Sequence, residues 1–191
     1  MAPGAVPEVP GPASGRRGAS ASPVGFRAGY GGVHDPVASA RLREADAPVV
    51  QAWLRTYLAE HLSWWQAAYG SSPASDLAEL VGRDWQELIG VNPDRQWVRV
   101  AGEHRAQGIV FAEKRRDRYM GFEVGVLSWI YVDETARGQG VSTALMTAAG
   151  DWMTAQGVRG REVFVTAQNT AAVRLYERHG YRVVDHRMLG P

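Results

Sequence analysis

The spacing of apolar side chains predicts one short strand and two helices in the first part of the folded chain. The strand is expected over residues 39–43, and Asp46 and Pro48 then mark a helix start through a side-chain cap and a preset backbone angle. Apolar residues recur at helical spacing from 50 to 62 and again from about 74 to 89. The second helix lacks the basic stripe of a nucleic-acid-reading helix, so no nucleic-acid partner is expected.

The period then changes to two, which indicates β-structure. Residues 97–100 and 109–111 predict an antiparallel hairpin, and a longer strand is expected from about 122 to 132. Beyond a glycine-rich turn, the pattern predicts a helix over about 139–156, a strand over 162–166, a helix over about 170–178 and a final strand over about 181–188. The order β-α-α-β-β-β-α-β-α-β corresponds to an α/β fold (α+β, three layers) with a mixed central sheet and helices on both faces.

Residues 1–33 differ from the rest of the chain in composition. They hold five of the ten prolines and eight of the 22 glycines. Such a segment cannot bury enough apolar surface to offset the entropy that it loses on ordering. We therefore expect a disordered tail over residues 1–33 and a single domain over residues 34–191.

Charge and cysteine content exclude several classes of function. The 21 basic and 20 acidic residues leave a net charge of +1, which gives no electrostatic reason to bind nucleic acid or an anionic membrane. The absence of cysteine excludes disulfides, thiolate zinc sites and a cysteine nucleophile. The five histidines lack ligand spacing, so no metal is expected. No apolar run reaches the roughly 18 to 20 residues of a membrane span, and a cytoplasmic protein is expected.

The turn before the third predicted helix carries the most informative residues. Gly138 and Gly140 allow a ligand to approach the backbone, and the unpaired amides of the next helical turn favour an anion such as pyrophosphate. Arg137, Ser142 and Thr143 can add a charge and two hydroxyl groups. A P-loop would need a lysine and an earlier glycine, and a dinucleotide fingerprint would need a third glycine. From these residues alone, a glycine turn without a ligand stays an alternative.

Two motifs occur in order in the second half of the chain. Arg137 and Gly140 match the pattern Gln/Arg-x-x-Gly-x-Gly/Ala, and Ser142 departs from it at the last position, one small residue for another. A second pattern, Asn-x-x-Ala-x-x-Leu-Tyr-x-Arg/Lys-x-Gly-Phe/Tyr, is matched by Asn169, Ala172, Leu175, Tyr176, Arg178, Gly180 and Tyr181. With both motifs, the segment from about 98 to 187 resembles the GCN5-related N-acetyltransferases (the GNAT superfamily).

The resemblance implies an N-acetyltransferase that transfers the acetyl group of acetyl-CoA directly to a primary amine of a small molecule or peptide. It implies a GNAT-like fold, and because paired subunits are common in the family it makes a homodimer an expectation. Acetyl-CoA would lie along a strand edge, whose backbone N–H would polarise the thioester carbonyl, and would reach the glycine turn. The residues expected to bind it are Ile130, Tyr131, Val132, Arg137, Gly138, Gln139, Gly140, Val141, Ser142, Thr143 and Asn169.

The resemblance also assigns catalytic roles. Tyr176 is expected to act as general acid toward the coenzyme A sulfur, since a phenol with a pKa near 10 can donate to a thiolate with a pKa of about 8.5. Glu123 is expected to act as general base through water, although a slip of one residue would place Val124 there. A core tyrosine and an exposed strand-end glutamate are the structural alternatives. His61 is a second candidate base, with a solvated helix-terminal histidine as its alternative.

The acceptor is the least defined part of the prediction. Trp64, Trp65 and Tyr69 are expected in the connection between the first two helices, where the resemblance places the acceptor cleft, and core packing would explain them as well. Two other classes of function stay open. One is a catalytically silent acyl-CoA-binding or regulatory module, and the other is a nucleotide-binding oxidoreductase that would prefer NAD.

Overall fold

The computed structural model describes residues 39–189. The segment predicted to be a disordered tail, 1–33, lies outside these residues. Across the part of the chain that the structure describes, no helix is both long enough and apolar enough to cross a membrane.

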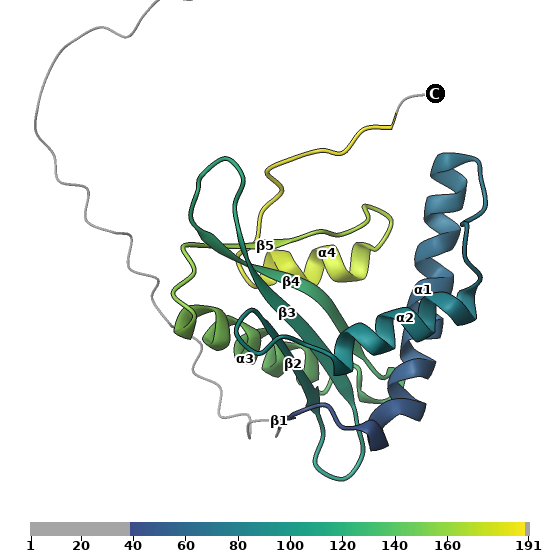
Figure 1. The fold of residues 1–191 in the computed structure, drawn as a ribbon, viewed down its shortest axis with the longest axis horizontal. Helices are drawn as coiled ribbons and strands as arrows, with labels where there is room; N and C mark the ends of the chain where they lie inside the picture. The colour runs from purple at the N-terminus through teal and green to yellow at the C-terminus, as the bar shows by residue number, and fades with distance from the viewer. Residues whose placement is uncertain (1–38, 190–191) are drawn as a thin grey trace, which may run out of the picture. The chain divides into compact units, whose positions relative to one another are not determined.

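A five-stranded mixed sheet forms the centre of the domain (Figure 1). Its strands are β1 (Ser39–Ala40), β2 (Gln96–Ala101), β3 (Gly108–Arg116), β4 (Glu123–Val132) and β5 (Gly160–Val163). They lie in chain order, with antiparallel neighbours up to β4 and a parallel pairing between β4 and β5. The mixed sheet that the hydrophobic pattern predicts is confirmed.

Two helices cover one face of the sheet, α1 (Ala47–Tyr69) and α2 (Leu77–Ile89). Their apolar sides pack with one set of alternating strand residues, because side chains along a strand point to opposite faces in turn. This core contains Trp53, Leu58 and Trp85 from the helices and Phe111 and Trp129 from the strands. The face covered by α1 and α2 is called the helix-pair face below.

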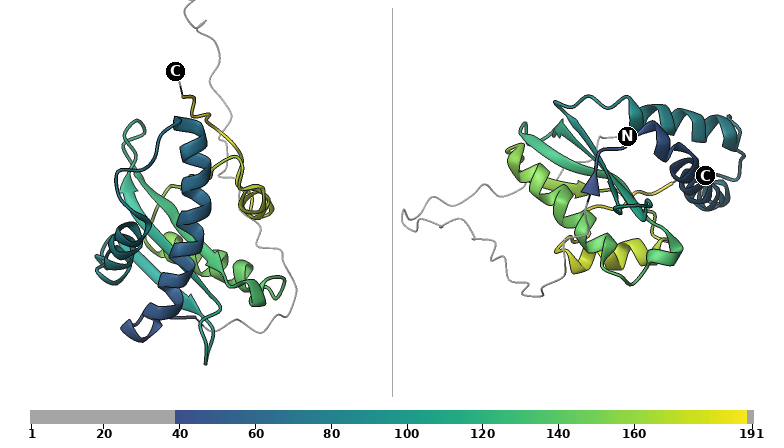
Figure 2. Two further views of the ribbon diagram at one scale, coloured as in Figure 1. Left: turned by 90° about the vertical axis from the view of Figure 1, so that its right-hand side faces the viewer. Right: turned by 90° about the horizontal axis from the view of Figure 1, so that it is seen from below.

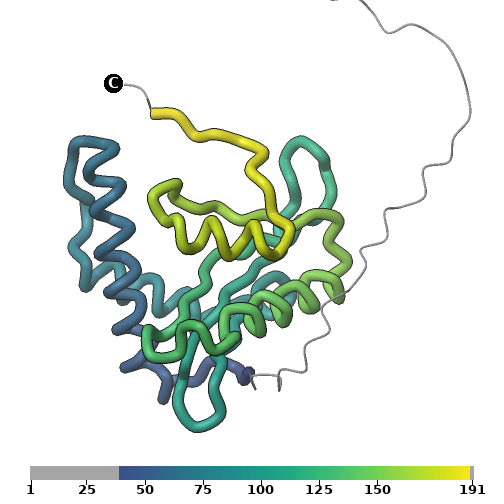
Figure 3. Tube along the Cα trace, turned by 180° about the vertical axis from the view of Figure 1, so that it is seen from behind, coloured from purple at the N-terminus to yellow at the C-terminus, as the bar shows by residue number. Residues whose placement is uncertain are grey.

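The opposite face is covered by α3 (Val141–Ala155) and α4 (Thr170–Arg178). Leu145 and Met153 of α3 and Tyr176 of α4 pack there against Val110 and Leu127 of the sheet. Figure 2 and the rear view in Figure 3 show α3 and α4 together on this side, with α1 and α2 on the other. The predicted three-layer arrangement is thus confirmed.

The pairing of β4 with β3 is interrupted near the middle of β4. Phe111 pairs with Trp129 and Ala112 with Leu127, so Ser128 is an extra residue that forms a β-bulge. The parallel pairing of β4 with β5 also stops at Leu127. Among the described residues, β4 therefore has no hydrogen-bonded strand beside it on this edge after Leu127, and its backbone groups there are available to a ligand.

Two local predictions are wrong at the first helix. The Asp46 carboxylate does not cap α1; it accepts hydrogen bonds from the backbone N–H and the guanidinium of Arg43, one turn earlier. An arginine three residues away outcompetes the helix amides for this carboxylate. Pro48 does stand in the first turn of α1, as expected. The helix also continues to Tyr69, seven residues beyond the predicted end at 62, and stops at Gly70 in the left-handed conformation (φ 66°).

The predicted final strand over 181–188 is also wrong. In the described part of the chain, residues 181–189 pair with no strand, and their only backbone-to-backbone hydrogen bond runs from Tyr181 N–H to the Tyr176 carbonyl. Val183, Val184 and Met188 are exposed. Alternating apolar residues form a strand only when a sheet edge accepts them, and here the segment follows α4 toward the end of α1 instead (Figure 1).

Candidate functional site

The glycine turn between β4 and α3 is open on its outer side. Gly138 and Gly140 have φ angles of 77° and 82°, in the left-handed region that other residues avoid. A Cβ placed at either position would meet no atom within 4 Å. The backbone conformation thus explains the glycines, and the open space beside them leaves room for a ligand.

The first turn of α3 offers its amides to that space. Gly140 is the N-cap and has no side chain to accept their hydrogen bonds. The first hydrogen bond within the helix runs from the N–H of Ala144 to the Gly140 carbonyl. The N–H groups of Val141, Ser142 and Thr143 come before it and have no acceptor within the helix. Val141 is buried and can contribute only this backbone group, while Thr143 is exposed. The arrangement fits an anionic group such as a pyrophosphate.

Arg137 is the cation beside these amides. Its side chain is 57% exposed, and its nearest carboxylate is Glu134 at 3.7 Å, a loose contact that a phosphate could replace. The side chain of Gln139, unlike that of Arg137, is already engaged within the turn, because its amide donates to the Thr135 carbonyl over 2.8 Å. Gln139 therefore reaches a ligand through its backbone rather than its side chain.

Asp133 fixes the start of the turn. One carboxylate oxygen accepts from the N–H and the hydroxyl of Thr135, and the other accepts from the Trp53 indole of α1 over 3.1 Å. These hydrogen bonds, those of Thr135 first, lower the pKa of Asp133, so the carboxylate stays charged at neutral pH. Asp133 could not be identified from the sequence as a residue that holds the turn, because its partner Trp53 lies 80 residues away.

Strand β4 and helix α4 carry the remaining residues that are predicted to bind the donor. Ile130, Tyr131 and Val132 are half-buried and lie after the bulge, where β4 has its free edge. Asn169 is the N-cap of α4, and its side-chain oxygen accepts from the Ala172 N–H over 3.1 Å, as expected. The amide nitrogen of the same side chain is left to donate to a ligand.

Tyr176 and Tyr57 pack on opposite faces of the sheet. Tyr176 belongs to α4 and is 8% exposed, whereas Tyr57 belongs to α1 and packs against the helix-pair core. Burial raises the pKa of Tyr176, and so does the charge that Tyr57 would carry if it ionised. Tyr176 therefore keeps its proton at neutral pH.

Glu123 lies at the other end of β4. Its carboxylate forms an ion pair with Arg95 at 3.2 Å. By strand alternation it shares a face with Gly125, against which Met153 of α3 packs. The structure therefore does not place Glu123 on the helix-pair face, and Val124, which does point there, carries no titratable group.

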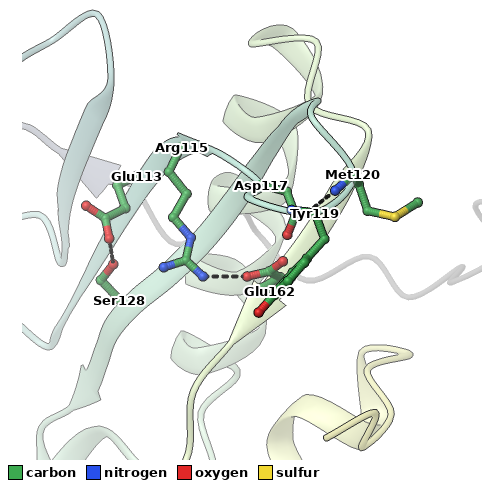
Figure 4. Close-up of polar contacts among 7 residues, drawn as sticks. All are labelled: Glu113, Arg115, Asp117, Tyr119, Met120, Ser128 and Glu162. Atoms are coloured by element: carbon green, nitrogen blue, oxygen red, sulfur yellow. Dashed lines mark hydrogen bonds and ion pairs between the residues drawn. The ribbon is translucent and has the colours of Figure 1, made fainter.

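A different carboxylate lies at the bulge on the helix-pair face. Glu113 follows Phe111 by two residues on β3 and accepts a hydrogen bond from the Ser128 hydroxyl over 3.0 Å (Figure 4). Beside it, Arg115 of β3 pairs with Glu162 of β5 at 2.7 Å. Glu113 could not be selected as a site residue from the sequence, because only the register of β3 against the bulge brings it to Ser128.

Helix α2 adds two more carboxylates to this region. Burial raises the pKa of Glu87, and the negative charges of Asp84 and Glu113 raise it further. Burial raises the pKa of Tyr57 on α1, and the charge of Asp84 raises it further. The negative charges of Asp84 and Glu113 thus act on Glu87, and these three carboxylates are called the acidic region below, although Arg83 pairs with Asp84 at 3.2 Å and partly offsets their charge.

The aromatic residues expected in the connection between the first two helices lie on α1 itself. Trp64, Trp65 and Tyr69 occupy its last turns. The Trp65 indole donates to His61 Nε2 over 2.6 Å, while His61 Nδ1 lies 3.4 Å from the Thr166 hydroxyl in the loop after β5. His61 therefore joins α1 to that loop and is not a simply solvated histidine.

Burial lowers the pKa of His61, which is neutral when it accepts from Trp65. At pH values between the ordinary histidine pKa of about 6.5 and this lower pKa, His61 is protonated more often in the unfolded chain than in the folded protein. We expect the free energy of unfolding to fall as the pH drops through this window. In His61→Gln, which keeps an acceptor but does not titrate, the fall should be smaller in urea titrations. Equal pH dependence of the two proteins would contradict the assignment.

Trp129 leaves one buried donor in the site. Its side chain is 7% exposed, and its indole N–H finds no hydrogen-bond partner among the described residues. The ring lies 5.9 Å from Tyr57 and 6.1 Å from Tyr131, measured between ring centroids. An unpaired buried donor costs about 1–3 kcal/mol, which a bound molecule that accepts from it would offset.

Comparisons with known proteins show the family of the chain. The profile of the acetyltransferase (GNAT) family matches residues 52–181. A curated relative, the mycothiol acetyltransferase of Actinosynnema mirum, is 32% identical over 117 residues, which is 61% of this chain and 36% of the relative. The chain thus spans about a third of that relative's length.

Solved structures share the fold. A protein of Pyrococcus furiosus superposes with a TM-score of 0.62 at 21% identity, covering 78% of this chain and 95% of its own. A mutant protein of Bacillus halodurans gives a TM-score of 0.65 at 17% identity, covering 81% of this chain and 98% of its own. With the profile covering more than half of its residues, the chain belongs to the GNAT family of acetyltransferases.

Proposed function

We propose that this acetyltransferase takes acetyl-CoA as donor and transfers its acetyl group directly to a primary amine of a small molecule or peptide. One observation carries the proposal. The amide-lined glycine turn follows the free edge of β4 along the chain, and the buried, protonated Tyr176 packs on the sheet face that α3 and α4 cover. A phosphate site, a backbone edge and a protonated phenol are the three features that a thioester donor needs.

The residues of the turn fit the donor. The open space at Gly138 and Gly140 and the α3 amides would hold the pyrophosphate, with Arg137 supplying positive charge. The free backbone groups of Ile130 to Val132 would pair with the amides of the pantetheine arm, in the manner of an added strand. Acetyl-CoA would supply the acetyl group as a reactive thioester.

Tyr176 would stabilise the leaving sulfur. Its raised pKa makes it a weaker acid than a coenzyme A thiol, whose pKa is about 8.5. Complete proton transfer from Tyr176 is therefore uphill, and its hydroxyl acts best by donating a hydrogen bond to the developing thiolate. The net proton can come from the attacking nitrogen, which becomes a neutral amide after it loses its protons.

The amine must lose a proton before it attacks. For an alkyl amine with a pKa of about 10.4, this costs about 4.6 kcal/mol at pH 7, so a general base is expected. Glu123 stays a prediction in this role. Glu113 is better placed in one respect, because it lies at the bulge on the same face as Tyr57 and the α1 aromatics.

Two charge-neutralising variants separate these carboxylates. We expect Glu113→Gln to lower kcat/KM for an amine at neutral pH by about 10²-fold, the scale of general-base catalysis. Glu123→Gln, which loses only an ion pair with Arg95, should stay within about threefold of the parent protein. The pH profile decides between them, since the variant of the true base loses the acidic limb. The reverse ranking would assign the base to Glu123.

The proposed function is tested in two steps. Acetyl-CoA is first titrated into the protein by calorimetry, with NAD as the competing ligand. A panel of primary amines is then screened for release of free thiol, and a thiol reagent has no background here because the chain contains no cysteine. Binding of acetyl-CoA with turnover on some amine supports the proposal. Binding without turnover on any amine would favour a silent acyl-CoA-binding module, and preference for NAD would overturn the donor assignment.

A further inference from the structure

An aromatic ladder runs along the C-terminal half of α1. Its members follow at intervals of four residues, which places them one above the other on a helix. Ring centroids lie 5.4 Å apart for Tyr57 and His61, 5.8 Å for His61 and Trp65, and 5.4 Å for Trp65 and Tyr69. The ladder therefore leads from Tyr57, whose ring lies 5.9 Å from that of Trp129 beside the bulge, to the end of the helix.

The upper end of the ladder already holds a cation from the same chain. The guanidinium carbon of Arg187 lies 4.7 Å from the Trp65 ring centroid, and Arg187 donates to the Tyr69 hydroxyl over 2.8 Å. The two aromatic side chains thus meet a guanidinium in two ways, through a ring face and through a hydrogen-bond acceptor. The hydrogen bond from Trp65 to His61 holds the indole in position for this contact.

The segment that delivers Arg187 is loosely attached. Residues 182–189 are exposed, and in the described chain Tyr181 is the only member of 181–189 with a backbone-to-backbone hydrogen bond. Figure 1 shows this segment running from the end of α4 toward the upper end of α1. A guanidinium held by an exposed contact is worth only about 0.5–1 kcal/mol, so an external cation can compete with it.

We propose that Trp65 and Tyr69 form a cation site for the amine acceptor, which Arg187 occupies when no acceptor is bound. The acceptor is then a primary amine that also carries a guanidinium group, because that group reproduces both contacts of Arg187. This proposal rests on the proposed acetyl transfer. The acidic region of Asp84, Glu87 and Glu113 on the same face attracts such a dication.

The ladder also sets a length. Trp65 lies eight residues beyond Tyr57, which corresponds to about 12 Å along the helix at 1.5 Å per residue. A guanidinium on Trp65 and an amine near the level of Tyr57 are therefore about 12 Å apart. Within a series of guanidinoalkyl amines of increasing chain length, turnover should be best for the members that span this distance.

Binding without acetyl-CoA provides the decisive test. Calorimetry would compare a guanidinoalkyl amine of that length with the alkyl amine that lacks the guanidinium. We expect Arg187→Gln to bind the guanidino compound about threefold or more tighter than the parent protein, because the competing cation is gone. Tyr69→Phe removes only the acceptor hydroxyl and should weaken binding, as should Trp65→Leu. Tyr69 is 51% exposed, so its variant provides a test even if Trp65→Leu does not fold.

The outcomes distinguish this site from the proposed function. Unchanged affinity in both Arg187→Gln and Tyr69→Phe, or equal affinity for the two amines, would overturn the cation site even if other amines are acetylated. Guanidinium-dependent binding that follows both variants would support the site. If that binding is found but no amine releases thiol from acetyl-CoA, the site stands as a cation site and the proposed acetyl transfer fails.

Discussion

Gly140→Asp should abolish acetyl-CoA binding while leaving the fold intact. A carboxylate at this position would lie beside the first-turn amides of α3, accept their hydrogen bonds and repel a pyrophosphate. Two like charges about 4 Å apart near a protein surface repel by about 4 kcal/mol, so a loss of at least about 100-fold in affinity is expected. Calorimetric titration with acetyl-CoA would measure it.

Two control variants separate the charge from the backbone strain. Any side chain at φ 82° costs about 1–2 kcal/mol, and Gly140→Ala measures that cost alone, since nothing lies within 4 Å of the new Cβ. Gly140→Asn has nearly the shape of the aspartate without its charge, and asparagine tolerates the left-handed region best. The alanine and asparagine variants should both bind acetyl-CoA more tightly than the aspartate variant. Retained affinity in the aspartate variant would mean that this turn does not bind the donor.

The features that were predictable from the sequence are those that depend on neighbouring residues. The glycine turn is one, because positive φ angles and free helix amides follow from Gly138, Gly140 and the start of a helix. The cap of α4 by Asn169 is another. Alternation and helical spacing also gave the three layers and the mixed sheet correctly, since each pattern is read within one element.

The features that were missed depend on contacts between distant residues. The bulge at Ser128 shifts the register of β3 and β4, and only that shift brings Glu113 to the site. The ion pair of Glu123 with Arg95 is likewise a contact between residues distant in the sequence. The packing of Tyr57 and Tyr176 on opposite faces of the sheet also follows only from the tertiary structure.

Two predictions, the end of α1 and the final strand, were wrong for other physical reasons. Helix α1 was expected to end at 62, but stacking between aromatic residues four apart continues it to Tyr69. This continuation creates the ladder that Arg187 contacts. The strand expected over 181–188 had the right alternation and no sheet edge that accepted it. Its residues instead carry Arg187 to α1, so a failed strand prediction marks the segment on which the cation site depends.

Tyr176→Phe should lower kcat by about 10²-fold and leave the affinity for acetyl-CoA within about twofold. The hydroxyl is argued to act only as the thiolate develops, so its loss affects the transition state and not the bound donor. The ring stays, and with it the packing against Tyr181, whose centroid lies 5.9 Å away. Single-turnover kinetics of thiol release, run with saturating donor, would measure the chemical step directly.

Tyr181→Phe is the matched control, because it removes a neighbouring phenol hydroxyl that has no assigned role. The raised pKa of Tyr176 adds a prediction about pH. A phenol that ionises above its ordinary pKa of about 10 stays protonated across the neutral range, so the parent protein should show no loss of kcat from Tyr176 below about pH 10. An alkaline limb that begins lower and persists in Tyr176→Phe would belong to another group. Unchanged single-turnover rates in Tyr176→Phe would remove this hydroxyl from the mechanism.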